Sequence, residues 1–191
     1  MRYRPEHKAE IHHKIVKDAS RRIRAEGVNG AAVAAVMRDA GLTHGGFYKH
    51  FGSKEDLLAE ALSDAFHEIA DFLARGAEQT HRGAAWKTIV RIYLSPEHCD
   101  HAECGCPVAA LAPELARADK TTKARIAEEL TSYKNRLAPL MPGRRAVDKE
   151  RNFIAIFSTM IGAVAIARML PDPKSRASVL ATARDFLLHS F

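Results

Sequence analysis

Hydrophobic residues recur at every third or fourth position along almost the whole chain. Over residues 6–26, for example, Ile11, Ile15 and Ala19 fall on one face of a helix, and Gly27 follows as a stop signal. We find no convincing alternation of polar and apolar residues of the kind that is typical of a β-strand. The pattern therefore predicts an all-α protein.

The same periodicity, interrupted by glycine, proline and polar breaks, predicts about nine helices. They cover residues 6–26, 31–39, 43–49, 53–75, 83–95, 107–117, 120–140, 146–170 and 174–189. Ser53 is expected to cap the fourth of these helices, with Asp56 three residues later as in a capping box. We place a domain boundary inside this helix, so that residues 1–54 form a small domain and residues 55–191 a larger helical one.

Basic residues are concentrated in the predicted small domain. Up to Lys54 the chain has 11 Lys and Arg against 5 Asp and Glu, whereas the remaining 18 basic and 18 acidic residues cancel. A basic head on a neutral body is the expected layout of a nucleic-acid-binding domain carried by a larger one. A solvated basic face without a partner would give the same charge pattern.

The sequence gives little indication of a signal peptide, a disulfide framework or a membrane span. The N-terminus lacks the apolar run of a signal peptide, and three cysteines, an odd number, argue against a disulfide framework. The most apolar segment, residues 153–167, is short and contains Ser158 and Thr159, which favours a buried helix over a membrane span. We therefore expect a cytoplasmic protein with no membrane partner.

Two short predicted helices meet at a tight turn at Gly41, and the second, residues 43–49, is only two turns long. This is the helix-turn-helix arrangement, whose second helix lies in the major groove of DNA. The second helix and its flanks supply groups that can hold phosphates. These are Thr43 at the start, which is expected to cap the helix, and the donors Tyr48, Lys49, His50 and Lys54 at the other end.

The stretch LTHGGFYKHF, residues 42–51, places Gly45 and Gly46 side by side within this second helix. Each glycine costs a helix roughly 1 kcal/mol relative to alanine, so the pair needs a reason. Without a Cβ at either position the helix backbone can approach DNA closely. His44 is then the main projecting side chain, and its imidazole suits the reading of a base edge.

Residues 37–62, MRDAGLTHGGFYKHFGSKEDLLAEAL, resemble the DNA-binding domain of the TetR-type (tetracycline-repressor-like) transcriptional regulators. The positions that fit the family motif are Gly45, Phe47, Tyr48, His50, Phe51 and Lys54. The residues that the resemblance implies to face the groove are Thr43, His44, Gly45 and Gly46. Those implied to hold the DNA backbone are Tyr48, His50 and Lys54, while Phe47 and Phe51 are implied to pack inward.

The chain departs from this family at the start of the first of the two short helices. Family members often carry Ser or Thr there, whereas this chain has Ala31 and Ala32. We therefore expect that helix to contribute few side-chain contacts to DNA. Base reading should rest on a small set of residues.

A palindromic double-stranded operator needs two DNA-binding heads, so a homodimer is expected. The helices at 146–170 and 174–189 are the expected interface, because the first is apolar on more sides than one core-facing stripe requires. The resemblance implies the same pair of helices, and a monomeric bundle with the first helix at its centre is the alternative. The expected interface residues are Phe153, Ile156, Met160, Val164, Val179 and Phe186.

The resemblance also implies a pocket in the larger domain for a small-molecule effector whose binding releases the DNA, as in a repressor. The plausible lining residues are Trp86, Tyr93, Phe157 and Met160. Aromatic and methionine residues at helical spacing are nevertheless more often plain core.

All three cysteines lie in one loop, SPEHCDHAECGCP at residues 95–107, and three interpretations remain open. The thiols and imidazoles could bind zinc or copper, although H-x2-H-x2-C-x-C is not a common structural-zinc spacing, and we expect no metal or other cofactor. Cys106, at a helix start, could have a lowered pKa and act as a thiol sensor resolved by Cys104 or Cys99. The thiols could also simply pack.

A Cys/His enzyme is the rival functional class. The sequence offers no third group to orient a nucleophile and base, and no glycine-rich phosphate loop. An enzyme would also leave the helix-turn-helix unexplained. We therefore expect a DNA-binding regulator and not an enzyme.

Overall fold

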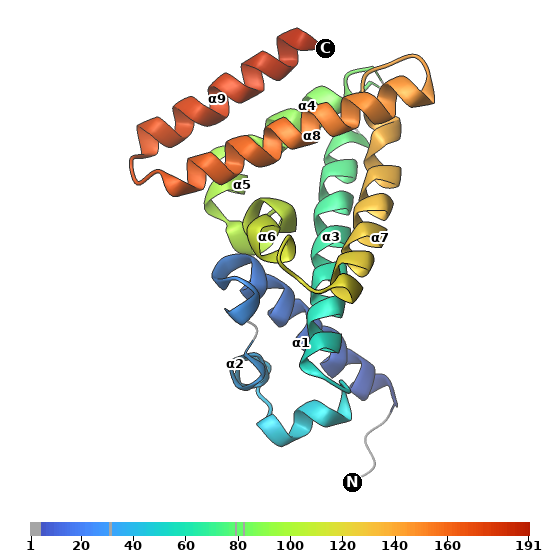
Figure 1. Cartoon of the computed structure of the whole chain (residues 1–191), viewed down its shortest axis with the longest axis vertical. Coiled ribbons are helices and arrows are strands. Elements are labelled where there is room, and N and C mark those ends of the chain that lie inside the picture. The colour runs from blue at the N-terminus through green and yellow to red at the C-terminus, as the bar shows by residue number, and fades with distance from the viewer. Residues whose placement is uncertain (1–4, 31, 79, 82) are drawn as a thin grey trace.

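The computed structural model describes residues 5–30, 32–78, 80–81 and 83–191, and no β-strand occurs among them. Figure 1 shows an elongated arrangement, with the N-terminal helices at one end and the last two helices side by side at the other. The all-α prediction is confirmed for these residues. Ala31, where the sequence pattern begins its second helix, lies outside them.

The N-terminal helices form a head at the lower end of Figure 1. They are α1 (Pro5–Glu26), the short 3-10 helix η1 (Val28–Gly30), α2 (Val33–Asp39) and the 3-10 helix η2 (His44–Lys49). The long helix α3 (Lys54–Glu78) starts in the head and runs upward out of it. Head and body therefore share one continuous helix.

The rest of the chain forms the body. Its helices are α4 (Ala85–Tyr93), α5 (Pro96–Asp100), η3 (Ala102–Cys104), α6 (Pro107–Leu115), α7 (Lys120–Leu137), η4 (Ala138–Leu140), α8 (Ala146–Met169) and α9 (Pro173–Ser190). In Figure 1, α7 runs beside α3, and α8 and α9 lie together at the end farthest from the head.

Helix α5 lies where the sequence predicts only a loop. Pro96 occupies its first turn, and the Ser95 hydroxyl caps it by accepting a hydrogen bond from the His98 amide at 3.1 Å. A proline is tolerated at that position because its missing N–H would have no partner within the helix. Pro96 therefore begins a helix here, where the sequence pattern predicts a break between helices.

Two clusters of buried residues divide α3 between them. Leu57, Ala61 and Leu62 pack into the core of the head, whereas Phe66 and the buried residues after it belong to the core of the body. Leu111 and Leu115 of α6 also fill the core of the head. The head is thus completed by a body helix that follows it by some 50 residues in the sequence.

A buried arginine joins the head to the body. The Arg24 side chain of α1 is fully buried, and its guanidinium donates to Glu68 Oε2 at 2.6 Å and to the Gly105 carbonyl at 3.1 Å. Nearby, the Val28 amide donates to Glu114 Oε2 at 2.8 Å. These charge-assisted hydrogen bonds fix the end of α1 against α3, α6 and the loop that carries the cysteines.

Helix α8 extends beyond the apolar segment 153–167 at both ends. It has 24 residues and is long and apolar enough, by length and composition, to cross a membrane, a test that the core helix of a soluble protein also passes. In the structure α8 packs against α6 and α9. Its other side leaves large apolar residues exposed, among them Ile154, Ile166 and Met169.

Candidate DNA-binding site

The turn between α2 and η2 has the geometry that a helix-turn-helix requires. Gly41 has a φ of +77°, and its amide donates to the Arg38 carbonyl at 2.9 Å. The Leu42 amide donates to the Met37 carbonyl at 2.8 Å, which completes a Schellman motif. A residue with a Cβ would be strained at Gly41, so the turn depends on this glycine.

Helix η2 is anchored by two phenylalanines. Phe47 and Phe51 are 2% and 3% exposed, and their rings stack with centroids 5.4 Å apart. This confirms the prediction that both pack inward. The opposite side of η2 is open, and it presents Thr43, His44, Gly45, Tyr48 and Lys49 to solvent.

The helix termini around η2 only partly follow the prediction. Thr43 occupies the position before the helix, but its side chain makes no capping hydrogen bond, so the predicted Thr43 cap is wrong. Ser53 does cap α3, because its hydroxyl accepts a hydrogen bond from the Asp56 amide at 3.0 Å. Lys54, the first residue of α3, is exposed beside η2 and suits the predicted contact with the DNA backbone.

His50 is half-buried at the end of η2, and its Nδ1 atom has no hydrogen-bond partner. Burial lowers the pKa of His50, and the positive charges of His12, Lys8 and Lys49 lower it further. Its ring therefore stays uncharged at neutral pH. If His50 holds the DNA backbone as predicted, it does so as a neutral hydrogen-bond donor and not as a cation.

Gly45 and Gly46 are not needed for the shape of the free protein. Neither has a φ in the left-handed region, and a Cβ on Gly45 would meet nothing within 4 Å. A Cβ on Gly46 would lie 3.6 Å from Met37 Cε, which is an ordinary contact. No backbone or packing constraint among the described residues explains the pair, and the close approach of DNA stays a prediction.

We expect Gly46→Ala to stabilise the fold by up to about 1 kcal/mol, because alanine loses less backbone entropy on folding. The same change should weaken DNA binding by about tenfold or more, because the added methyl group separates η2 from the groove. Chemical denaturation and fluorescence anisotropy with DNA would measure the two effects.

Gly83→Ala is the matched control for this change. Gly83 lies between α3 and α4, far from η2 in sequence, and a Cβ there would also meet nothing within 4 Å. Unchanged or tighter DNA binding by Gly46→Ala would contradict the close-approach explanation.

His44→Ala is expected to relax the sequence preference by about 1–3 kcal/mol at one base pair, because the imidazole is the projecting group best suited to a base edge. Lys54→Ala should instead weaken binding to all sequences alike and reduce the salt dependence by about one ion, as expected for a phosphate contact. Selection of binding sites by each variant would separate the two roles. An unchanged preference in His44→Ala would remove the proposed base contact.

Both ring nitrogens of His98, in the cysteine loop, form hydrogen bonds within the protein, so the imidazole does not face a metal site. Its Nδ1 atom donates to the Tyr93 carbonyl at 2.7 Å, and its Nε2 atom accepts from the Cys106 amide at 3.1 Å. Burial lowers the pKa of His98 to about 4, so the ring is neutral, as this pattern of one donor and one acceptor requires. Across the described residues, no three His, Cys, Asp or Glu side chains gather as metal ligands.

Cys106 does not have the lowered pKa that its place at a helix start predicts. Burial raises the pKa of the Cys106 thiol, and the nearby Tyr93 hydroxyl and the backbone of Val108 and Ala109 offset this only in part. Desolvation of a fully buried thiolate thus outweighs the helix terminus. Cys99 is also buried, while Cys104 is exposed, and all three thiols are free.

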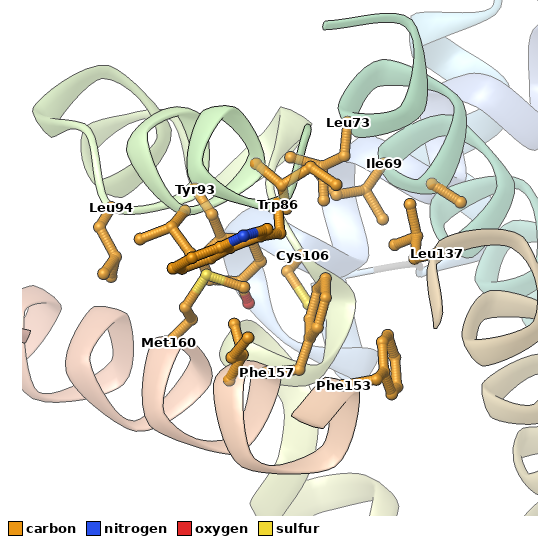
Figure 2. Packing of buried hydrophobic residues seen from close by; sticks show 14 of the residues in the cluster. Ile69, Leu73, Trp86, Tyr93, Leu94, Cys106, Leu137, Phe153, Phe157 and Met160 are labelled. Atoms are coloured by element: carbon orange, nitrogen blue, oxygen red, sulfur yellow. The ribbon is translucent and has the colours of Figure 1, made fainter. Parts of the chain in front are cut away.

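The residues predicted to line an effector pocket lie together, but in a packed core. Figure 2 shows Trp86, Tyr93, Cys106, Phe157 and Met160 converging from different helices, and each is at most 3% exposed. The ring centroids of Tyr93 and Phe157 are 5.9 Å apart in an edge-to-face arrangement. The sequence prediction therefore finds one contiguous cluster, and core packing is the role that this structure shows for it.

Most of the predicted dimer-interface residues face the interior of the protomer. Phe153, Ile156, Met160 and Val164 are at most 8% exposed, and Val179 packs against the same core. In this protomer the four α8 residues are enclosed by the core of their own chain, whereas Val179 of α9 is partly buried, and the interface as a whole stays a prediction. Phe186, at 62% exposed, is the member of the set that remains available.

The fold and the exposed surface of η2 define the chain as a helix-turn-helix protein. Residues 15–61 match the sequence model of a family described as "Bacterial regulatory proteins, tetR family". The HTH-type transcriptional regulator TtgR of Pseudomonas putida is 38% identical over 65 residues. That match covers 34% of this chain and 30% of TtgR, so the chain spans less than a third of this relative's length.

Solved structures extend the likeness to nearly the whole chain. A TetR transcriptional regulator from Chloroflexus aurantiacus superposes with a TM-score of 0.77 at 24% identity, covering 95% of this chain and 94% of that one. FadR from Bacillus subtilis, in complex with stearoyl-CoA, superposes with a TM-score of 0.66 at 18% identity. This match covers 92% of this chain and 96% of that one. Residues 15–61 therefore carry a sequence motif similar to that of the tetR family, and the chain has the same overall fold as these solved regulators.

Proposed function

We propose that this protein is a dimeric, sequence-specific transcriptional regulator that acts in the cytoplasm as a repressor and leaves its palindromic operator when a small molecule binds the body. The exposed surface of η2 supports DNA binding most strongly. There, His44, Tyr48 and Lys49 project around a glycine pair that the free protein does not need. Lys54 adds a cation at the edge of the same surface.

A second copy of the chain is supported by the apolar surface that α8 and α9 leave open. Ile154, Ile166 and Met169 on α8 are 60%, 49% and 73% exposed, and Phe186 lies exposed on α9. Large apolar side chains gathered on neighbouring helices usually mark an interface. We propose that these residues, in place of the buried ones predicted from the sequence, pair with their counterparts across a two-fold axis.

An effector site in the body is supported by two buried tyrosine hydroxyls. The Tyr133 hydroxyl has no hydrogen-bond partner, and the Tyr93 hydroxyl has only the weakly polar Cys106 thiol beside it. An unsatisfied buried hydroxyl costs about 1–3 kcal/mol. A ligand that brought an acceptor into this core would recover that energy, and FadR from Bacillus subtilis shows that the same fold holds a ligand in that protein.

Selection of bound fragments from the source genome tests the proposed function. The protein should enrich a small number of discrete fragments over bulk DNA, and the genes beside them should indicate the effector. Uniform, sequence-independent recovery of fragments would contradict sequence-specific regulation.

A further inference from the structure

A groove of about 620 Å³ lies between the first half of α3 and the first half of α7, away from the exposed faces of α8 and α9. Its apolar floor includes Leu62 and Phe66 of α3, which are buried, and Ile126 of α7, which is partly buried. A cavity of this size accommodates a drug-sized organic molecule. Neither η2 nor the tyrosine hydroxyls of the body contribute to it.

The rim of the groove is strongly acidic. Its carboxylates are Glu55, Asp56, Glu60, Asp119, Glu128 and Glu129, and among the described lining residues Arg125 is the one Lys or Arg. The body as a whole carries equal numbers of acidic and basic residues, so this excess of negative charge is local. The groove therefore attracts cations and repels anions.

Some of these carboxylates already have partners within the chain. Glu60 pairs with His12 at 2.6 Å, Glu129 lies 3.9 Å from His67, and Asp119 accepts the Thr121 and Thr122 amides at the start of α7. Glu55, Asp56 and Glu128 form no ion pair among the residues that the structure describes. These three side chains remain to balance the charge of a ligand.

We propose that this groove binds a hydrophobic organic cation, with its apolar body on the floor and its charge at the carboxylate rim. Burial of apolar surface supplies the affinity, and the rim selects the sign of the charge. The inference goes beyond the proposed DNA-binding function and does not depend on it. The groove takes its lining from α3 and α7 within a single chain, so it needs no second copy either.

Isothermal titration calorimetry on the full-length protein, without DNA, tests this site with three probes. Tetraphenylphosphonium carries both the apolar body and the positive charge, and it should bind. Tetraphenylborate has almost the same shape and the opposite charge, and tetramethylammonium has the charge without the apolar body. Neither should bind measurably in the same concentration range.

Substitution of the rim carboxylates tests whether tetraphenylphosphonium binds in this groove. The combined change Glu55→Gln and Glu128→Gln should weaken tetraphenylphosphonium binding by about tenfold, because two nearby charges are lost at nearly constant shape. Glu150→Gln, on α8 outside the groove, should bind like the unmodified protein. Equal affinity for the borate, or an unchanged affinity in the doubly substituted protein with an intact circular dichroism spectrum, would overturn the proposal.

Discussion

Arg24→Ala is expected to lower the free energy of unfolding by about 3–5 kcal/mol, the usual consequence of removing one partner of a buried ion pair. The Arg24 side chain has no exposed surface, and besides Glu68 and Gly105 it binds the carbonyl and hydroxyl of Ser20. Its loss would leave the Gly105 carbonyl without its partner, and the Glu68 carboxylate, which is 28% exposed, would keep only the weaker ion pair with Lys17 at 3.6 Å.

Urea denaturation monitored by circular dichroism would measure this loss. Arg21→Ala is the control, because Arg21 lies on the same helix but is exposed, and its substitution should change stability by less than about 0.5 kcal/mol. Arg24→Lys should give an intermediate value, since lysine keeps the charge but cannot make the branched set of hydrogen bonds. A loss below about 1 kcal/mol in Arg24→Ala would show that this pair does not hold head and body together.

The same ion pair gives a defined dependence on pH. Burial alone would raise the pKa of Glu68, but the hydrogen bond and charge of Arg24, with Lys17 and Arg21, lower it below its ordinary value. The contribution to stability is therefore present above the pKa of a glutamate in the unfolded chain, about 4.3. It should disappear as the pH falls through the lower pKa of the folded state, and the Arg24→Ala protein should lack this component.

Ile154→Glu combined with Phe186→Glu is expected to convert a dimer into folded monomers and to weaken operator binding by about a hundredfold or more. Both side chains are at least 60% exposed in the protomer, so the substitutions should leave its fold intact. Four glutamates across a two-fold interface would repel one another and remove apolar contacts. A monomer then loses the gain in affinity that comes from two linked heads.

Sedimentation velocity and fluorescence anisotropy would follow assembly and DNA binding in the same preparations. Leu130→Glu is the control, because Leu130 is an exposed apolar residue on α7, outside the proposed interface. It should remain dimeric and bind DNA normally. A dimer that survives both substitutions, or a monomer with full operator affinity, would contradict the proposed interface.

The arrangement of helices could be predicted from the sequence because periodicity and stop signals are local. Gly27 and Gly41 mark real helix ends with positive φ, and Ser53 forms the predicted cap. Whether η2 forms an α-helix or a 3-10 helix is harder to predict from the sequence. It forms a 3-10 helix, with a hydrogen bond from the Gly46 amide to the Thr43 carbonyl, where two glycines weaken the preference for an α-helix.

Properties that depend on distant parts of the chain could not be predicted in the same way. A helix that is apolar on more than one side, such as α8, gives no local signal of which side faces the core, so the sequence does not distinguish buried Ile156 from exposed Ile154. The pKa of Cys106 likewise depends on burial by several helices and not on its own helix start. The same holds for Arg24, whose partners Glu68 and Gly105 lie 44 and 81 residues away in the sequence.

Footprinting on a fragment selected from the genome tests the central claim most directly, because it reports where two heads sit on one DNA molecule. Two protected half-sites should appear, related by two-fold symmetry and separated by about one helical turn or a multiple of it, as expected for paired η2 helices in successive major grooves. Protection should disappear in the Ile154→Glu and Phe186→Glu protein at the same concentration. A single asymmetric protected site, or protection that survives loss of the dimer, would contradict the claim that this chain reads an operator as a symmetric dimer.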